Sequence, residues 1–147
     1  MSHIAQFAAY AAAFEQAFRS DDWTSIERFF TEDAVYDAGL PEPLGGRFEG
    51  RAAVLAYFKR VLDAFDRRFA SREVSLVEGP REQGDSVWLR GAARYAAPGV
   101  PDLRFELEET AWFEGDRIGR LEDRYDAATR SALETYLRAH GAKLGLG

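Results

Sequence analysis

The chain of 147 residues contains no cysteine and only two histidines. Without cysteine there are no disulfides, thiolate nucleophiles or cysteine-ligated metal sites, and the composition is compatible with the reducing cytoplasm, where we expect the protein to reside. His3 and His140 stand near opposite ends of the chain, so a zinc site is not expected. We predict no cofactor.

Clustered positive charge and long apolar runs are missing as well. Lys59 and Lys143 are the only lysines, and the net charge is −6. A nucleic-acid groove needs clustered positive charge, so we expect no nucleic-acid partner. No apolar run approaches the roughly 18 residues that span a bilayer, and Met1–Ile4 does not open a signal peptide. We therefore expect no membrane partner.

What the chain does have is a large apolar fraction, 46% hydrophobic with 14% aromatic residues, enough for one packed domain over residues 1–147. Apolar residues recur at spacings of three and four from Ile4 to Phe18, which predicts a first helix. Similar patterns predict three more helices, the last closed by Gly141: Trp23–Phe30, Arg51–Arg67 and Ala127–Ala139.

Between and after these helices the pattern changes to a period of two, which is typical of strands. A short strand is predicted at Ala34–Asp37, followed by a Pro- and Gly-rich loop over Gly39–Gly50. Four longer strands are predicted, with tight turns at Gly84-Asp85 and Gly115-Asp116: Arg72–Glu78, Ser86–Ala96, Leu103–Phe113 and Arg117–Tyr125. This order predicts an α+β fold, with helices on one face of a curved antiparallel sheet.

Two carboxylates interrupt the apolar rows of the last two predicted strands. Glu109 shares a row with Leu107 and Ala111, and Asp123 shares one with Leu121. An acid buried in an apolar interior has a raised pKa and can act as a general acid or base near neutral pH. The alternative is a structural role, in which each carboxylate simply binds a helix terminus, a tyrosine hydroxyl or an arginine.

Over about residues 5–126 the chain resembles a known family, and five segments carry the resemblance: Phe14–Trp23, Ile26–Asp37, Phe48–Val54, Trp112–Ile118 and Glu122–Asp126. They are similar to ketosteroid isomerases and SnoaL-like polyketide cyclases of the nuclear-transport-factor-2-like superfamily. The resemblance implies a cone-shaped curved sheet, with the N-terminal helices on its concave face and a C-terminal helix. The scaffold hosts isomerases, cyclases, dehydratases and non-enzymes, so it does not name the reaction.

The resemblance to the isomerase implies a site with several replacements. Phe14 stands where the isomerase has its oxyanion-hole tyrosine, and Phe58 stands where it has a supporting tyrosine, beside Tyr57. Its general-base aspartate corresponds to Ala38, with Asp37 adjacent and turned inward only by a bulge. Its protonated oxyanion-hole acid corresponds to Glu109.

The resemblance to the cyclases implies a role for the last strand. Asp123 corresponds to their acid/base aspartate, whereas Glu109 replaces their partner histidine. In the related limonene-epoxide-hydrolase-like enzymes an Arg-x-Asp pair is needed, and here Arg90 is followed by Gly91 and Ala92.

The sequence thus predicts a cofactor-free acid/base enzyme acting on a small, largely apolar ketone, as a cyclase, isomerase or dehydratase. Glu109, Asp123 and Asp37 are the catalytic candidates. The predicted substrate-binding residues are Tyr36, Tyr57, Phe14, Phe18, Phe58, Leu107 and Tyr125. The alternative is a non-catalytic ligand-binding or dimerisation module of the same fold.

The outward rows of two neighbouring strands mix tryptophan with arginine, a composition typical of interfaces. This face predicts a homodimer contact through Trp88, Trp112, Arg90 and Arg94.

Overall fold

The computed structural model describes residues 2–146. Its helical elements within this range are α1 (His3–Ser20), η1 (Trp23–Phe29), α2 (Arg51–Ala64), η2 (Asp66–Arg68), α3 (Ala127–His140) and η3 (Gly141–Leu144), where η denotes a 3-10 helix. Its strands are β1 (Phe30–Ala38), β2 (Gly46–Glu49), β3 (Ser71–Gln83), β4 (Ser86–Ala96), β5 (Leu103–Glu114) and β6 (Arg117–Arg124). This is the predicted α+β class, with helices first, then a strand meander and a final helix.

The strands form one sheet in the order β2-β1-β6-β5-β4-β3. All neighbours are antiparallel except β1 and β6, which run parallel. The predicted sheet was antiparallel throughout; the parallel pair arises because the last strand returns to lie beside the first. The pairing places residues about 85 positions apart in sequence next to each other, such as Ala38 beside Asp123.

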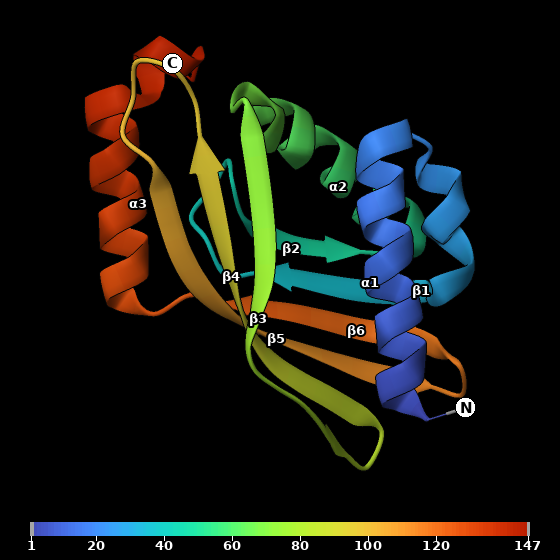
Figure 1. Cartoon of the computed structure of the whole chain (residues 1–147). Helices are drawn as coiled ribbons and strands as arrows, with labels where there is room; N and C mark the ends of the chain where they lie inside the picture. The colour runs from blue at the N-terminus through green and yellow to red at the C-terminus, as the bar shows by residue number, and fades with distance from the viewer. Residues whose placement is uncertain (1, 147) are drawn as a thin grey trace.

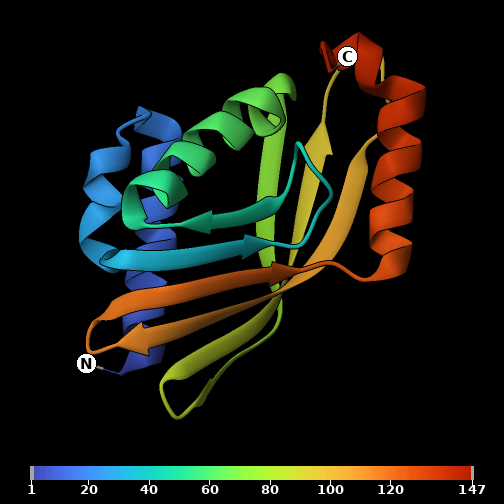
Figure 2. The same cartoon turned by 180° about the vertical axis from the view of Figure 1, so that it is seen from behind.

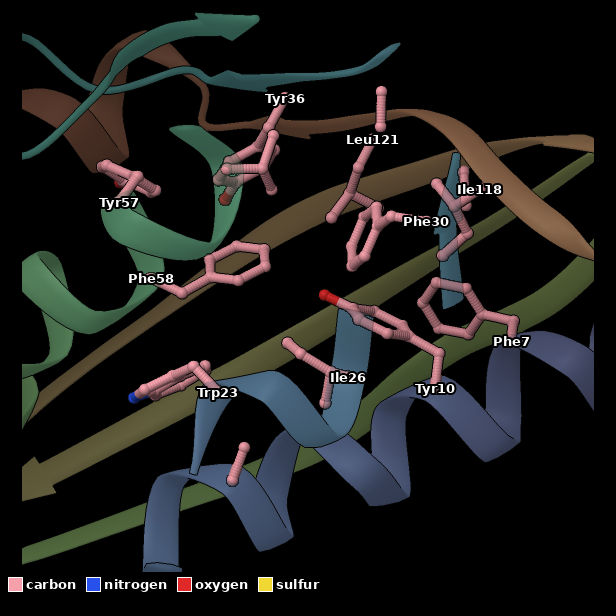
Figure 3. Packing of buried hydrophobic residues seen from close by; sticks show 14 of the residues in the cluster. Phe7, Tyr10, Trp23, Ile26, Phe30, Tyr36, Tyr57, Phe58, Ile118 and Leu121 are labelled. Carbon is pink, nitrogen blue, oxygen red and sulfur yellow. The ribbon is translucent and has the colours of Figure 1, made fainter. Parts of the chain in front are cut away.

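The sheet curves, and its long strands bend around the space that the first two α-helices enter (Figures 1 and 2). Helix α1 packs on β3 and β4, and α2 packs on β1, while α3 contacts β5 at the other end of the sheet. Figure 3 shows the aromatic core between α1, η1, α2 and the sheet, in which Tyr10, Phe30 and Phe58 meet. The helices thus cover the concave face, as the sequence predicted.

Helix α1 begins and ends where local chemistry dictates. The Ser2 side chain accepts a hydrogen bond from the Ala5 amide at 3.1 Å, which satisfies one of the free donors of the first turn. Asp21, with φ of 60°, ends the helix in the left-handed conformation. The apolar face from Phe7 to Ala17 is buried, so the predicted first helix is confirmed.

The largest local difference from the predictions lies in the Gly39–Gly50 segment, which contains strand β2. This strand pairs with β1 from Val35↔Glu49 to Ala38↔Gly46. The chain turns back so tightly that a Cβ at Gly45 would lie 1.9 Å from the Leu40 carbonyl oxygen, so only glycine fits at this position. A four-residue strand after a Pro- and Gly-rich turn is too short to show an alternation pattern.

Two helix ends also differ from prediction. Helix α2 ends at Ala64 and the chain continues as η2, where a single helix to Arg67 was expected. Helix α3 ends at His140 with Gly141 as its C-cap, as predicted, but the φ of Gly141 is helical at −57° and the chain continues into η3. Gly145, with φ of 76°, ends that segment instead.

No helix between residues 2 and 146 has the length and apolar character to cross a membrane.

Candidate functional site

A cavity of about 400 Å³ lies between the helices and the concave face of the sheet. Its volume falls in the range of pockets that hold small organic molecules, about 300–1,000 Å³. Its walls are largely aromatic and aliphatic and include Phe7, Phe14, Phe58, Val61, Leu62, Leu107 and Leu121. An apolar ligand of modest size therefore fits this space.

Strands β5 and β6 bring two acids together on the cavity wall. Their register pairs Glu109 directly with Asp123, and both side chains line the cavity. Asp123 is 7% exposed, whereas Glu109 is half-buried, with the cavity beside it. The inward projection that alternation predicted for both acids is confirmed.

Asp123 is held by a tyrosine from the neighbouring parallel strand. The Tyr36 hydroxyl donates a buried hydrogen bond to Asp123 Oδ2. The other oxygen, Oδ1, is buried and has no hydrogen-bond partner among residues 2–146. Glu109 is the residue directly opposite Asp123 in the strand pair. Tyr36 thus orients the Asp123 carboxyl, and Glu109 is its neighbour on the adjacent strand.

Burial governs the ionisation of this pair. It raises the pKa of Glu109 well above the ordinary value of 4.5, and the charge of Asp123 raises it further. Burial also raises the pKa of Asp123, although the neighbouring Glu109 carboxyl and the Tyr36 hydroxyl oppose the rise. The two acids titrate together, so the pair holds one proton and one negative charge over a range that extends above the ordinary carboxylic pKa.

Four further tyrosines line the cavity: Tyr10, Tyr57, Tyr95 and Tyr125. The Tyr57 hydroxyl is engaged by the Leu44 carbonyl oxygen at 2.5 Å, so its part in the site is to close the wall. Tyr10 and Tyr125 have no side-chain hydrogen bond among residues 2–146, and burial raises the pKa of both well above 10. They are neutral donors available to a ligand.

Tyr10 is a site residue that the sequence reasoning missed. It lies three residues after Phe7 and four before Phe14, so the helical period already placed it on the inward face of α1. Figure 3 shows its hydroxyl directed away from α1, into the aromatic cluster. Phe14 occupies the position predicted from the isomerase, while the hydroxyl comes from Tyr10, about one turn earlier on the same helix.

Two predicted site residues lie outside the cavity wall. Asp37 faces the outer side of β1, because the β1 register is regular from Val35 to Ala38 and no bulge turns it inward. It pairs there with Arg47 at 3.1 Å and Arg120 at 3.2 Å. Phe18 does not line the cavity either and packs under arginine side chains instead. Asp37 was a catalytic candidate only if a bulge turned it inward, and that condition is not met.

The other predicted ligand-contacting residues do line the cavity: Tyr36, Tyr57, Phe14, Phe58, Leu107 and Tyr125. On the outer sheet face, the Trp88 indole donates to Glu108 at 3.0 Å, and Arg120 stacks on Trp112. Arg94 pairs with Asp102. The homodimer contact through this face stays a prediction.

Solved structures show the same fold in other proteins. An NTF2-like protein of unknown function from Burkholderia pseudomallei matches with a TM-score of 0.67 and 21% identity, over 92% of this chain and 98% of that one. TerC, co-crystallised with polyporic acid, matches with a TM-score of 0.65 and 20% identity, over 90% and 98% of the two chains. A candidate polyketide cyclase from Sinorhizobium meliloti gives 0.57 and 22%, over 79% and 94%.

These identities are low, so the structural matches establish the fold alone. A search of curated proteins finds no significant match. The family model described as the SnoaL-like domain matches residues 10–120, which include α1 from Tyr10 onward, Glu109 and most of the cavity wall but end before Asp123. The chain therefore belongs to the SnoaL-like family.

Proposed function

We propose that the protein is a cofactor-free acid/base enzyme that moves a proton on a small, largely apolar ketone. The observation that carries this proposal is the Glu109–Asp123 pair, a half-buried and a buried acid directly opposite each other on an apolar cavity wall. Like charges at this spacing cannot both ionise cheaply, so the pair retains a proton where isolated carboxyls would lose theirs. Such a pair can accept one proton and give it back.

The step that this geometry supports is enolisation. The singly charged pair takes a proton from the carbon next to a carbonyl, the C–H electrons form the enolate, and the pair becomes neutral. Glu109 is the member in contact with the ligand, because it is the more accessible of the two. It passes its own proton to the charged Asp123 as it takes the proton from the carbon, which leaves both acids protonated. The pair then returns the proton to the same or another position, which completes an exchange or an isomerisation.

The developing oxyanion needs neutral donors that do not themselves ionise. The hydroxyls of Tyr10 and Tyr125 meet this requirement, because their pKa values are raised and both residues line the cavity. Preorganised donors of this kind typically contribute about 10²–10³-fold to the rate. Tyr36 is a positioning residue, since its hydroxyl is already bound to Asp123.

The substrate class follows from the wall and from the relatives. A wall dominated by phenylalanine, leucine and tyrosine side chains favours a ring-containing, uncharged molecule. Structural neighbours include a candidate polyketide cyclase and TerC, which was crystallised with polyporic acid. These proteins support, by analogy, an oxygenated cyclic substrate.

The test uses 1-tetralone, a bicyclic ketone with one oxygen, and follows deuterium incorporation next to its carbonyl by NMR in D₂O. We expect the wild-type protein to accelerate exchange over buffer. Asp123→Asn and Glu109→Gln should each lower the enzymatic rate by roughly 10²–10⁴-fold, because each removes the shared proton site. Asp37→Asn is the matched control, since Asp37 lies on the outer face, and its rate should stay within about twofold of wild type.

Two results separate the alternatives. Exchange that persists in both the Glu109 and Asp123 variants would overturn the acid/base proposal. Saturable binding of the ketone by the wild-type protein, without any acceleration of exchange, would assign the cavity to a non-catalytic ligand-binding module.

A further inference from the structure

The cavity wall carries a second group of charged residues, distinct from the Glu109–Asp123 pair, in which Asp66 is buried and Arg72 and Glu15 are partly buried. Arg72 on β3 donates from Nε to Asp66 Oδ2 at 2.8 Å and from Nη1 to Glu15 Oε1 at 2.7 Å. The Tyr95 hydroxyl donates to the same Asp66 oxygen at 2.8 Å. All four residues line the cavity, and they come from β3, η2, α1 and β4. The enolisation step uses none of them.

The Arg72 guanidinium has a donor that no side chain uses. Its Nε and Nη1 are bound to carboxylates, whereas Nη2 has no partner among residues 2–146. The group is held in place by stacking on the Phe18 ring, 4.8 Å from the ring centroid. A guanidinium carries donors in a fixed, planar arrangement, so fixing two of its nitrogens also fixes the direction of the third. The result is a cavity-lining guanidinium of fixed orientation, one nitrogen of which binds no side chain among residues 2–146.

The charges around this donor determine which ligand group it can accept. Burial opposes the charge of Arg72, but the neighbouring acids Asp66 and Glu15 outweigh burial and raise its pKa, so the guanidinium stays charged. One positive charge already faces two carboxyl groups. A ligand carboxylate would be a third acid around the same cation and would meet repulsion from the other two. A neutral acceptor, such as a ketone, quinone or amide oxygen, meets no such repulsion.

The second group lies at a different part of the wall from the acid pair. The register places Arg72 beside Tyr95 and Tyr95 beside Leu103, six residues before Glu109 on β5. Six residues of strand correspond to roughly 20 Å of backbone, which sheet curvature and the long arginine side chain shorten. A ligand that reaches both groups must therefore be elongated and carry an oxygen near each end.

We propose that Arg72 is a specificity-determining residue that binds a neutral oxygen acceptor at the far end of the substrate. This inference rests on the proposed function for the reacting end and adds the substrate class: an elongated, uncharged ring compound with two oxygen functions, such as a diketone or a hydroxyketone. Asp66, Glu15 and Tyr95 are positioning residues, since they act through the guanidinium.

The experiment compares three biphenyl probes by titration calorimetry at pH 7.5. The probes are 4-hydroxybiphenyl, 4-acetyl-4′-hydroxybiphenyl and 4′-hydroxybiphenyl-4-carboxylate, which differ only in the group that would reach Arg72. We expect the wild-type protein to bind the acetyl probe at least about tenfold more tightly than 4-hydroxybiphenyl, the order expected for one hydrogen bond from a charged donor. The carboxylate probe should bind no more tightly than 4-hydroxybiphenyl.

The variant for this test is the double substitution Arg72→Gln with Asp66→Asn, which removes the cation together with its buried partner. Only Glu15, whose side chain is partly exposed, then lacks its cation. We expect it to reduce the preference for the acetyl probe to less than about threefold, while the affinity for 4-hydroxybiphenyl is retained. Arg67→Gln is the matched control, because Arg67 stacks on the same Phe18 ring at 5.2 Å but does not line the cavity. It should keep the wild-type preference.

Three results would overturn the inference: equal binding of the acetyl probe and 4-hydroxybiphenyl by the wild-type protein, a preference that survives in the double variant, or tightest binding of the carboxylate probe. The exchange assay with 1-tetralone has only one oxygen to bind, so it reports on Glu109 and Asp123 without Arg72. A failed acid/base proposal and a failed Arg72 proposal are thereby distinguished.

Discussion

Asp66 and Asp123 are both 7% exposed and both line the same cavity, yet they have different partners. Asp66 accepts hydrogen bonds from the charged Arg72 and from Tyr95. Asp123 accepts one from Tyr36 and faces a second acid, Glu109. Burial raises the pKa of both aspartates, but only Asp66 has a cation that opposes the rise.

The comparison separates two effects of burial. A buried carboxylate beside a cation is a stable ion pair, which can fix geometry and orient a donor. A buried carboxylate beside another acid shares a proton, and that proton is available for chemistry. Equal exposure therefore does not imply equal function, and the neighbouring side chain decides which behaviour follows.

The largest expected effect comes from removing the cation. Arg72→Met leaves the buried Asp66 and the partly exposed Glu15 without their positive partner. We expect a loss of about 3–5 kcal/mol in the free energy of unfolding, measured by urea denaturation. Asp123→Asn, which neutralises an acid that has no cation, should change this free energy by less than about 1 kcal/mol. Similar losses in the two variants would contradict the distinction drawn between the aspartates.

Removing the tyrosine hydroxyl that donates to each aspartate, Tyr36 for Asp123 and Tyr95 for Asp66, should have a smaller effect on stability than removing Arg72. Tyr36→Phe removes the hydroxyl donor of Asp123 and should cost about 1.5–3 kcal/mol of stability, the range for hydrogen bonds to charged groups. It should also raise the pKa of Asp123. In a plot of exchange rate against pH, the fall in rate on the acidic side, which we call the acidic limb, should then occur at higher pH. Tyr95→Phe leaves Asp66 with Arg72, so a smaller stability loss and no movement of that limb are expected. Identical pH profiles for the two variants would refute the assignment of Tyr36.

The smallest expected effect is a pH dependence of stability. Because the pKa of Glu109 is raised in the folded protein, its contribution to stability is fully present below the ordinary value of 4.5 and is lost as pH rises toward the folded pKa. Glu109→Gln has no proton to lose, so its melting temperature should exceed that of wild type by a few degrees at pH 8 and by less at pH 5. Thermal melts across this range measure the difference. A gap that narrows as pH rises would contradict the raised pKa.

Much of the candidate site could be predicted from the last two long strands. Alternation in β5 and β6 placed Glu109 and Asp123 inward, and the Gly115-Asp116 turn joined the two strands as an antiparallel pair. The same rule, applied to β1, placed Tyr36 inward and Asp37 outward, and only the allowance for a bulge made Asp37 a catalytic candidate. Local periodicity was sufficient here because the side-chain period of a strand is two.

What the amino-acid sequence determined on its own is therefore the class of fold, most helix and strand positions and the inward direction of the two acids. These follow from local rules of period, capping and turn chemistry. The tertiary structure alone decided that Tyr36 reaches Asp123, through the parallel β1–β6 pair, and that Arg72 meets Asp66 and Glu15 from three separate elements. Such contacts join residues far apart in the chain, and their partners are chosen by the packing of whole elements, which no local pattern encodes.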